Sequence, residues 1–189
     1  MRFTPGNEWS WGYANQPNGS TALILNITDQ NGVRYIFTTH YSTGELREFP
    51  QPGQQFCLED AALLTDFQQG LYEIHIEKDD ICLPLALNAL ACCRFVKLPR
   101  PCGRFFLPFS DGTLVHRGQV ISLYAKNGSI GDFMVLDDVP DGDVYRVMLL
   151  NPEWDLGNIV LKLGAMIRVP SSCICAFRSI SPDRSARYA

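Results

Sequence analysis

The sequence predicts an α+β protein, in which an N-terminal α/β part with antiparallel strands and two main helices joins a C-terminal β-barrel-like part. Alternating strands separated by Gly and Asn turns fill the first forty residues, and two apolar helical stretches follow. Beyond Pro99 and Pro101, short β-rich runs recur between turn residues. We expect an N-terminal domain over residues 1–98, a C-terminal domain over 99–180 and a flexible tail over 181–189.

The first strand is predicted from an alternation of large aromatic side chains. Trp9, Trp11 and Tyr13 occupy every second position, which places all three on one face of an extended segment. Turn signals that end in Gly19 and Gly32 separate it from two further strands. We therefore expect an antiparallel meander with Trp9 and Trp11 in the core. Its strands are expected at residues 8–14, 21–28 and 33–39.

Two helices are predicted after a Gly-, Pro- and Gln-rich loop over residues 42–55. The acidic pair Glu59 and Asp60 favours the start of the first helix, and Gly70 is expected to end it. Residues 71–78 alternate as in a strand but lie between helices. Asp79 or Asp80 is expected to cap the second helix, with a proline tolerated only in its first turn.

The second helix is expected to run to about Lys97 and to be buried, because it is apolar on nearly every side. After it the sequence changes to short β-rich runs, which predict a small barrel or sandwich. These runs are residues 104–109, 120–125, 133–136, 144–150, 159–163, 166–169 and 173–177.

Composition excludes several classes of function. The formal net charge of −4 gives no general attraction to nucleic acid or to anionic lipid. No stretch reaches the roughly 20 apolar residues of a membrane helix. The opening residues lack the apolar run of a signal peptide, and the seven cysteines are an odd number, so we expect a reducing cytoplasm and no disulfide framework.

No catalytic or metal-binding motif stands out, and we expect neither a cofactor nor enzymatic activity. The three histidines are scattered, and Cys173 and Cys175 are too close for a zinc loop. Cys102 is the best candidate nucleophile, because the flanking Arg100 and Arg104 could lower its pKa. No positioned base accompanies it in the sequence.

A cluster of cations is more informative. Arg94 and Lys97 lie at the end of the second helix, where positive charge also stabilises the helix dipole. That structural explanation does not extend to Arg100 and Arg104, which lie beyond the helix. We therefore predict a partner-binding surface formed by Arg94, Lys97, Arg100 and Arg104.

Three segments resemble the ZapC family of Z-ring-associated division proteins in order and spacing. They are MR-x-x-P followed by NEWSWGY, then FCLEDAALLTDF, then LALNALACCRFVK. The resemblance extends over roughly residues 1–104. Lys97 matches the family's lysine at the end of the LNAL helix, which belongs to a basic surface implicated in filament contact. The family's next basic position is Cys102 here, between Arg100 and Arg104.

This resemblance implies a non-catalytic cytoplasmic accessory protein at the mid-cell division site. Its partner would be polymerised FtsZ, whose filaments it would bundle while lowering GTP turnover. Whether the chain self-associates stays open at this point, as does the way in which one molecule touches two filaments.

Two other classes stay open. Arg100 and Arg104 have the R-x-x-x-R form, and residues 127–131 (NGSIG) resemble the N-x-S-x-x-G element of cyclic di-GMP-binding PilZ barrels, one residue short. Gly, Ser and Asn are also ordinary turn residues. The second alternative is an enzyme with Cys102 as its nucleophile.

Overall fold

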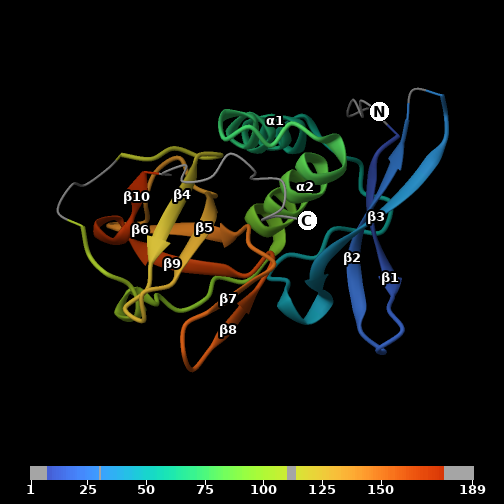
Figure 1. The fold of residues 1–189 in the computed structure, drawn as a ribbon. Coiled ribbons are helices and arrows are strands. Elements are labelled where there is room, and N and C mark those ends of the chain that lie inside the picture. Colours follow the sequence, from blue (N-terminus) through green and yellow to red (C-terminus); the bar gives the residue numbers. More distant parts are fainter. Residues whose placement is uncertain (1–7, 30, 110–113, 177–189) are drawn as a thin grey trace.

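The computed structural model, which describes residues 8–29, 31–109 and 114–176, confirms the α+β class. A three-stranded sheet lies on one side of the molecule and a five-stranded sheet on the other. Helix α2 (Asp79–Phe95) runs between them, and helix α1 (Leu58–Glu73) packs across α2. Figure 1 shows this arrangement. The expected tail, residues 181–189, lies outside the described residues.

The first sheet is the predicted meander, with β2 in its centre. Trp9 and Trp11 are both fully buried, as their alternation predicts, and Tyr13 donates a hydrogen bond of 2.7 Å from its hydroxyl to the Pro50 carbonyl. The third strand continues beyond its predicted end at residue 39. The strands are β1 (Ser10–Asn15), β2 (Thr21–Thr28) and β3 (Arg34–Ser42), followed by the 3₁₀ turn η1 (Thr43–Glu45).

The prediction that Gly70 ends the first helix is wrong. Gly70 lies inside α1 because the helix meets another backbone there: a Cβ at Gly70 would lie 1.6 Å from the Gly118 carbonyl oxygen. The helix ends one turn later, where His75 adopts a φ of 63° and donates its amide to the Tyr72 carbonyl. Residues 71–78 thus form a helix end and a turn, which settles their ambiguous pattern.

The second helix is buried nearly all round, as predicted. It begins after Lys78, whose side chain makes no capping hydrogen bond, and it ends at Phe95, two residues before the predicted end. Pro84 lies in its second turn, not the first. Asn88 donates to the Pro84 carbonyl and accepts from the His40 amide, which ties α2 to β3.

The five-stranded sheet has the order β10-β4-β5-β6-β9, and β7 pairs only with β8. These sheets are not closed, so the barrel is not confirmed. The strands are β4 (Val120–Tyr124), β5 (Ile130–Val135), β6 (Val144–Leu149), β7 (Glu153–Asp155), β8 (Val160–Lys162), β9 (Met166–Pro170) and β10 (Cys175–Ala176).

Two of the predicted runs are not continuous strands. Residues 104–109 form the 3₁₀ turn η2 (Gly103–Phe105) and a single bridge between Phe106 and Ala125, because nearby prolines cannot donate to a ladder. The last run is divided between the turn η3 (Ser171–Cys173) and the short β10. Its end, residue 177, lies outside the described residues.

The five-stranded sheet contributes to two cores, one on each face. Met134 and Met148 alternate with Phe133 and Val147 along β5 and β6. The first pair packs with α1, α2 and the three-stranded sheet, whereas the second pair packs around Trp154. One hydrophobic core therefore joins the two parts of the chain. The division into domains at residues 98 and 99 stays a prediction.

Candidate interaction surface

The chain that leaves α2 is fixed by the turn η1. Lys97 donates its backbone amide to the Glu45 carbonyl and its ammonium group to the Gly44 carbonyl, each over 2.8 Å. An isolated bridge between Leu46 and Val96 extends this pairing. Lys97 is exposed but held in place, so its charge has a defined position at the junction of the two parts.

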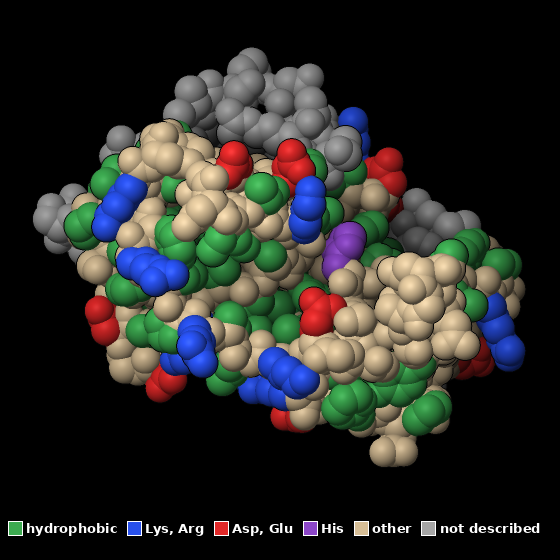
Figure 2. All heavy atoms as spheres, turned by 90° about the horizontal axis from the view of Figure 1, so that it is seen from below, with side chains coloured by type: hydrophobic (Ala, Val, Ile, Leu, Met, Phe, Trp, Pro, Cys, Tyr) green, Lys and Arg blue, Asp and Glu red, His purple; other side chains and the backbone are tan. Residues whose placement is uncertain are grey.

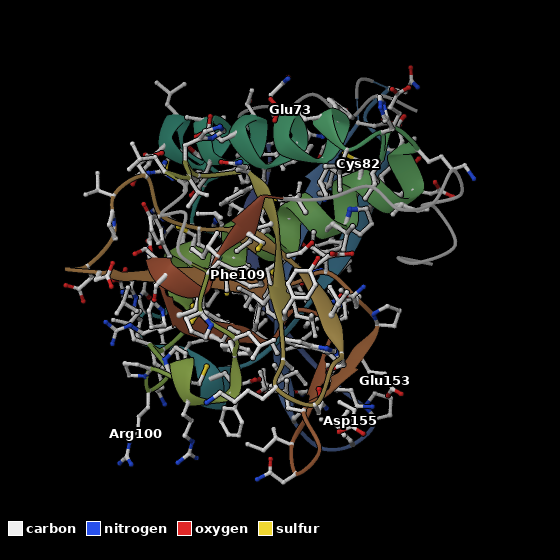
Figure 3. The ribbon with its side chains drawn as sticks, turned by 60° about the vertical axis from the view of Figure 1, so that its left-hand side comes forward. Glu73, Cys82, Arg100, Phe109, Glu153 and Asp155 are labelled. Carbon is white, nitrogen blue, oxygen red and sulfur yellow. The ribbon has the colours of Figure 1, made fainter. Side chains whose placement is uncertain are left out.

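The next residues run along β9. Pro101 forms a bridge with Arg168, and the Cys102 amide donates to the Arg168 carbonyl over 3.0 Å. Arg100 lies between the anchored Lys97 and the Pro101 bridge. Figure 3 shows its side chain pointing away from the body of the protein. The Arg104 guanidinium lies 4.8 Å from the centre of the Phe105 ring, which is a cation–π distance.

Lys97, Arg100 and Arg104 share an electrostatic property: none of them forms an ion pair with a described carboxylate. Lys126 also has none, and its amide donates to the Phe105 carbonyl, beside Arg104. We call these four residues the linker surface. Most other described cations are neutralised locally by ion pairs, namely Arg47, Arg94, Arg117, Arg146, Lys162 and Arg168.

A groove of about 470 Å³ opens beside Lys97, between η1 and the turn that joins β8 to β9. Val96, Leu163 and Met166 give it apolar walls, and Lys97 adds positive charge. Lys162 and Glu45 also line the groove, but Lys162 is paired with Glu153, and the Glu45 carboxylate accepts hydrogen bonds from Ser42. In Figure 2, hydrophobic side chains occupy a hollow near the middle of this face, with Lys and Arg side chains around it. The groove can therefore accept an acidic segment that carries an apolar side chain.

Arg94 lies apart from the other predicted residues. Its guanidinium pairs with the exposed Glu59 and lies 3.5 Å from Asp60, which is fully buried. Burial alone would lower the pKa of Arg94, but Asp60 and Glu59 outweigh this effect and the net shift is upward. The structure therefore brings Lys97, Arg100 and Arg104 into one stretch and places Arg94 in an internal ion-pair network.

That network lines a second cleft of about 610 Å³ on the other side of the α2 C-terminus. Arg146 reaches the Cys93 carbonyl over 3.3 Å and pairs with Asp137, and Arg117 pairs with Asp66 and Asp138. Each described arginine in the cleft has a carboxylate partner, so the cleft carries no excess of positive charge. Its ion pairs join α2 to α1 and α1 to the loop before β4, and the Arg146 hydrogen bond joins β6 to α2.

Most of the cysteines have the environment of structural residues, whereas Cys57 is exposed. Burial raises the pKa of Cys102. A backbone hydrogen bond with Arg168 and the charge of Arg104 lower it, as expected for Arg104, but burial outweighs both and the net shift is upward. Burial also raises the pKa of Cys92 to about 12. Among the described residues, no group of three or more His, Cys, Asp or Glu side chains could hold a metal ion.

The segment that resembles the PilZ element is the turn between β4 and β5. Asn127 accepts hydrogen bonds from the amide and hydroxyl of Ser129, and Gly128 has a φ of 88°. The Asn127 amide nitrogen also donates to the Asp155 carbonyl over 3.0 Å, and the Ser129 hydroxyl lies 3.0 Å from the same carbonyl oxygen. In this turn, the polar side chains that would contact a nucleotide in the sensor interpretation already have partners within the fold.

Sequence reasoning missed Lys126 and the groove walls. Lys126 is 22 residues from Arg104 in the chain, and Leu163 and Met166 belong to two separate predicted β-rich runs that give no sign of a groove. Only the pairing of η1 with the linker and of the linker with β9 brings them together.

The chain is similar to known cell-division proteins. Residues 2–97 match the family described as the N-terminal part of cell-division protein ZapC. A cell division protein ZapC from Aeromonas hydrophila is 28% identical over 72% of each chain. Another from Musicola paradisiaca is 28% identical over 93% of this chain and 90% of its own, and one from Proteus mirabilis is 22% identical over 100% and 98%.

None of the described helices combines the length and apolar character needed to cross a membrane. The family match covers more than half of the chain, and it includes the helices and the Lys97 end of the linker surface. The order of strands and helices in the structure agrees with the segments on which the resemblance rests. This chain belongs to the ZapC family of cell-division proteins.

Proposed function

We propose that this protein is a non-catalytic accessory of cell division that binds polymerised FtsZ in the cytoplasm at mid-cell. By bridging filaments it promotes their lateral association, stabilises the Z-ring and lowers GTP turnover. Membership of the ZapC family supports the role in cell division. The observation that carries the proposed binding is the concentration of unneutralised charge at Lys97, Arg100, Arg104 and Lys126.

Electrostatics favour this surface as the docking site for an acidic filament. The whole chain carries a net charge of −4, so it does not attract acidic surfaces in general. A local basic surface on such a protein steers association and orients the complex. Because Lys97 is anchored through Gly44, and Arg104 through Phe105, little side-chain freedom is lost on binding.

The groove beside Lys97 supplies the short-range part of the proposed contact. Apolar walls next to Lys97, which forms no ion pair with a described carboxylate, suit a segment that has both a carboxylate and an apolar side chain. Each such contact is small and its affinity modest, but a polymer presents many equivalent sites, which raises the apparent affinity.

Co-sedimentation with FtsZ assembled in GTP tests the proposal. The protein should pellet with polymer and stay in the supernatant when GTP is replaced by GDP. Added salt should release it, because charges on the surface are screened over about 10 Å at 0.1 M ionic strength. The same mixtures should scatter more light and release phosphate more slowly. Failure to pellet with polymer at low salt would contradict the proposal.

A further inference from the structure

Part of strand β3 forms an open edge of the three-stranded sheet. The sheet order is β1-β2-β3, so β3 has a neighbouring strand on one side only. The other edge is covered: the Trp11 amide donates to the Gln54 carbonyl over 2.8 Å, and its carbonyl accepts from the Gly53 amide. Figure 1 shows the start of β3, in light blue, at the outer edge of the molecule.

The ladder determines which backbone groups point outward from β3. The backbone amide and carbonyl of Trp11 point away from β2, towards residues 53 and 54. In the ladder, Trp11 is paired with Leu25 of β2, and Leu25 is paired with Phe37 of β3. The direction of the backbone groups alternates along and across an antiparallel sheet, so the amide and carbonyl of Phe37 bond to β2. The amides and carbonyls of Arg34, Ile36 and Thr38 therefore point outward. Beyond this segment the edge is covered, because the His40 amide donates to the Asn88 side chain on α2 over 2.9 Å.

The outward backbone groups of Arg34, Ile36 and Thr38 have no such cover among the described residues. No described residue outside the sheet bonds to the backbone of Arg34, Ile36 or Thr38. Two devices that often protect an edge are missing there: the segment has no proline, and its irregularity lies further on, towards Ser42. Arg34 is its one charged side chain. Its central side chain, Ile36, is 67% exposed.

The same five residues are complementary to themselves. In an antiparallel pairing centred on Ile36, each outward-directed residue meets another one: Arg34 meets Thr38 of a second copy, and Ile36 meets Ile36. On the other face of the strand, the half-buried Tyr35 meets Phe37 of the second copy. Aromatic and aliphatic pairs across strands are stabilising, and this register sets no two like charges opposite each other.

We propose that the open edge of β3 binds a second copy of this chain through this two-fold pairing. An extended segment of another protein could use the same hydrogen bonds, but it would not explain why each side chain of residues 34–38 meets a suitable partner in its own sequence. The charge arrangement also fits: Arg34 faces a neutral threonine in the paired state. Five paired residues bury less area than the roughly 1,200 Å² of a stable dimer, so the association is weak in dilute solution.

Weak pairing suits a protein that is concentrated on a polymer, because a high local concentration shifts the balance towards pairs. Two paired copies would present two linker surfaces and could hold two filaments. The pairing itself does not depend on the proposed FtsZ binding, and only this use of it rests on that proposal.

Disulfide trapping of the purified full chain tests the register without FtsZ. Paired Cα atoms in such a ladder lie about 5.5 Å apart, within the range of about 4.4–6.8 Å that a disulfide spans. In a background with the exposed Cys57 changed to Ser, diamide should convert Ile36→Cys into a covalent dimer on a non-reducing gel. The double variant Arg34→Cys/Thr38→Cys should also dimerise. Arg34→Cys alone and Thr38→Cys alone should stay monomeric, like the Cys57→Ser parent.

A backbone variant provides an independent control. Because the Ile36 amide points outward, Ile36→Pro removes only an edge donor and should melt within a few degrees of wild type. Added to the double-cysteine variant, Ile36→Pro should abolish the covalent dimer, whereas Ile36→Val should retain it. The proposed pairing would be overturned if Ile36→Cys formed no covalent dimer, or if Arg34→Cys alone or Thr38→Cys alone were trapped as efficiently as the double variant.

FtsZ distinguishes the two possible occupants of the edge. Ile36→Pro should co-sediment with polymer as wild type does but should lose the increase in light scattering. If Ile36→Pro instead lost co-sedimentation, the edge would bind a filament segment and the second copy would be the wrong occupant. If wild type itself failed to co-sediment, the FtsZ proposal would fail while the trapping result stood.

Discussion

At the scale of single residues, the sequence predicted which aromatic side chains are buried, but it did not predict their hydrogen-bond and ion-pair partners. The alternation of Trp9 and Trp11 predicted two core residues, and both are fully buried. The acid at the start of α1 has a second role that the sequence did not show: Asp60 accepts from the Trp11 indole over 3.2 Å and lies beside Arg94. These partners come from segments far apart in the chain, so no local pattern connects them.

The Trp11 indole therefore contributes both packing and a buried hydrogen bond. Trp11→Ala should lower the free energy of unfolding by about 3–5 kcal/mol, because it removes a fully buried aromatic side chain. Trp11→Phe should cost about 1–3 kcal/mol, since it leaves one oxygen of Asp60 without its indole donor. Urea titration measures both. Equal stability of Trp11→Phe and wild type would show that the indole bond contributes nothing.

His75 has a left-handed backbone conformation that favours glycine, with a φ of 63°. His75→Gly should raise the free energy of unfolding by about 0.5–1 kcal/mol, because relief of this conformation exceeds the entropy that glycine loses on folding. Gln69→Gly, at an exposed position inside α1, is the matched control and should lower it by about 1 kcal/mol. If both variants were destabilised alike, the conformation of residue 75 would carry no strain.

At the scale of elements, periodicity predicted the meander and both helices, and their ends depended on tertiary contacts. Gly70 was a reasonable helix end in the sequence, but it lies where α1 touches the backbone of Gly118. The run over residues 104–109 has strand composition, yet proline-rich surroundings leave it only one bridge. Both errors arise because the sequence of one element does not show its neighbour.

The contact between α1 and the loop before β4 should tolerate no side chain at residue 70. Gly70→Ala should lower the free energy of unfolding by about 1–3 kcal/mol or more, because the backbones must move apart. Gln69→Ala, the exposed neighbour, should be neutral or slightly stabilising. Thermal melting compares the two, and an unchanged melting temperature for Gly70→Ala would contradict the close approach.

At the scale of the whole molecule, the sequence indicated two parts and a basic linker between them. It did not show that one core spans both parts, nor that η1 and β9 hold the linker beside a groove. It also grouped Arg94 with the other cations, because sequence proximity does not reveal that Asp60 and Glu59 neutralise this arginine. The proposed partner-binding residues remain predictions that charge-changing variants can test.

The linker surface should act through charge and not through shaped phosphate recognition. Arg100→Lys/Arg104→Lys should therefore co-sediment with FtsZ almost as wild type does, since lysine keeps the charge but not the bidentate geometry of arginine. Titration of cyclic di-GMP into the wild-type protein should release no heat. Micromolar binding of that nucleotide, lost in the lysine variant, would favour the sensor interpretation instead.

Charge reversal with a matched control tests the central claim most directly. Lys97→Glu/Arg100→Glu changes the net charge by −4, and so does Arg34→Glu/Lys78→Glu, which alters two cations outside the linker surface that form no ion pair with a described carboxylate. Arg34 belongs to the proposed pairing edge, which co-sedimentation does not require. Co-sedimentation with FtsZ polymer at low salt should be lost in the first variant and retained in the second, with both variants melting like wild type. If both variants pelleted equally well, or both failed to pellet, the linker surface would not be the site of binding.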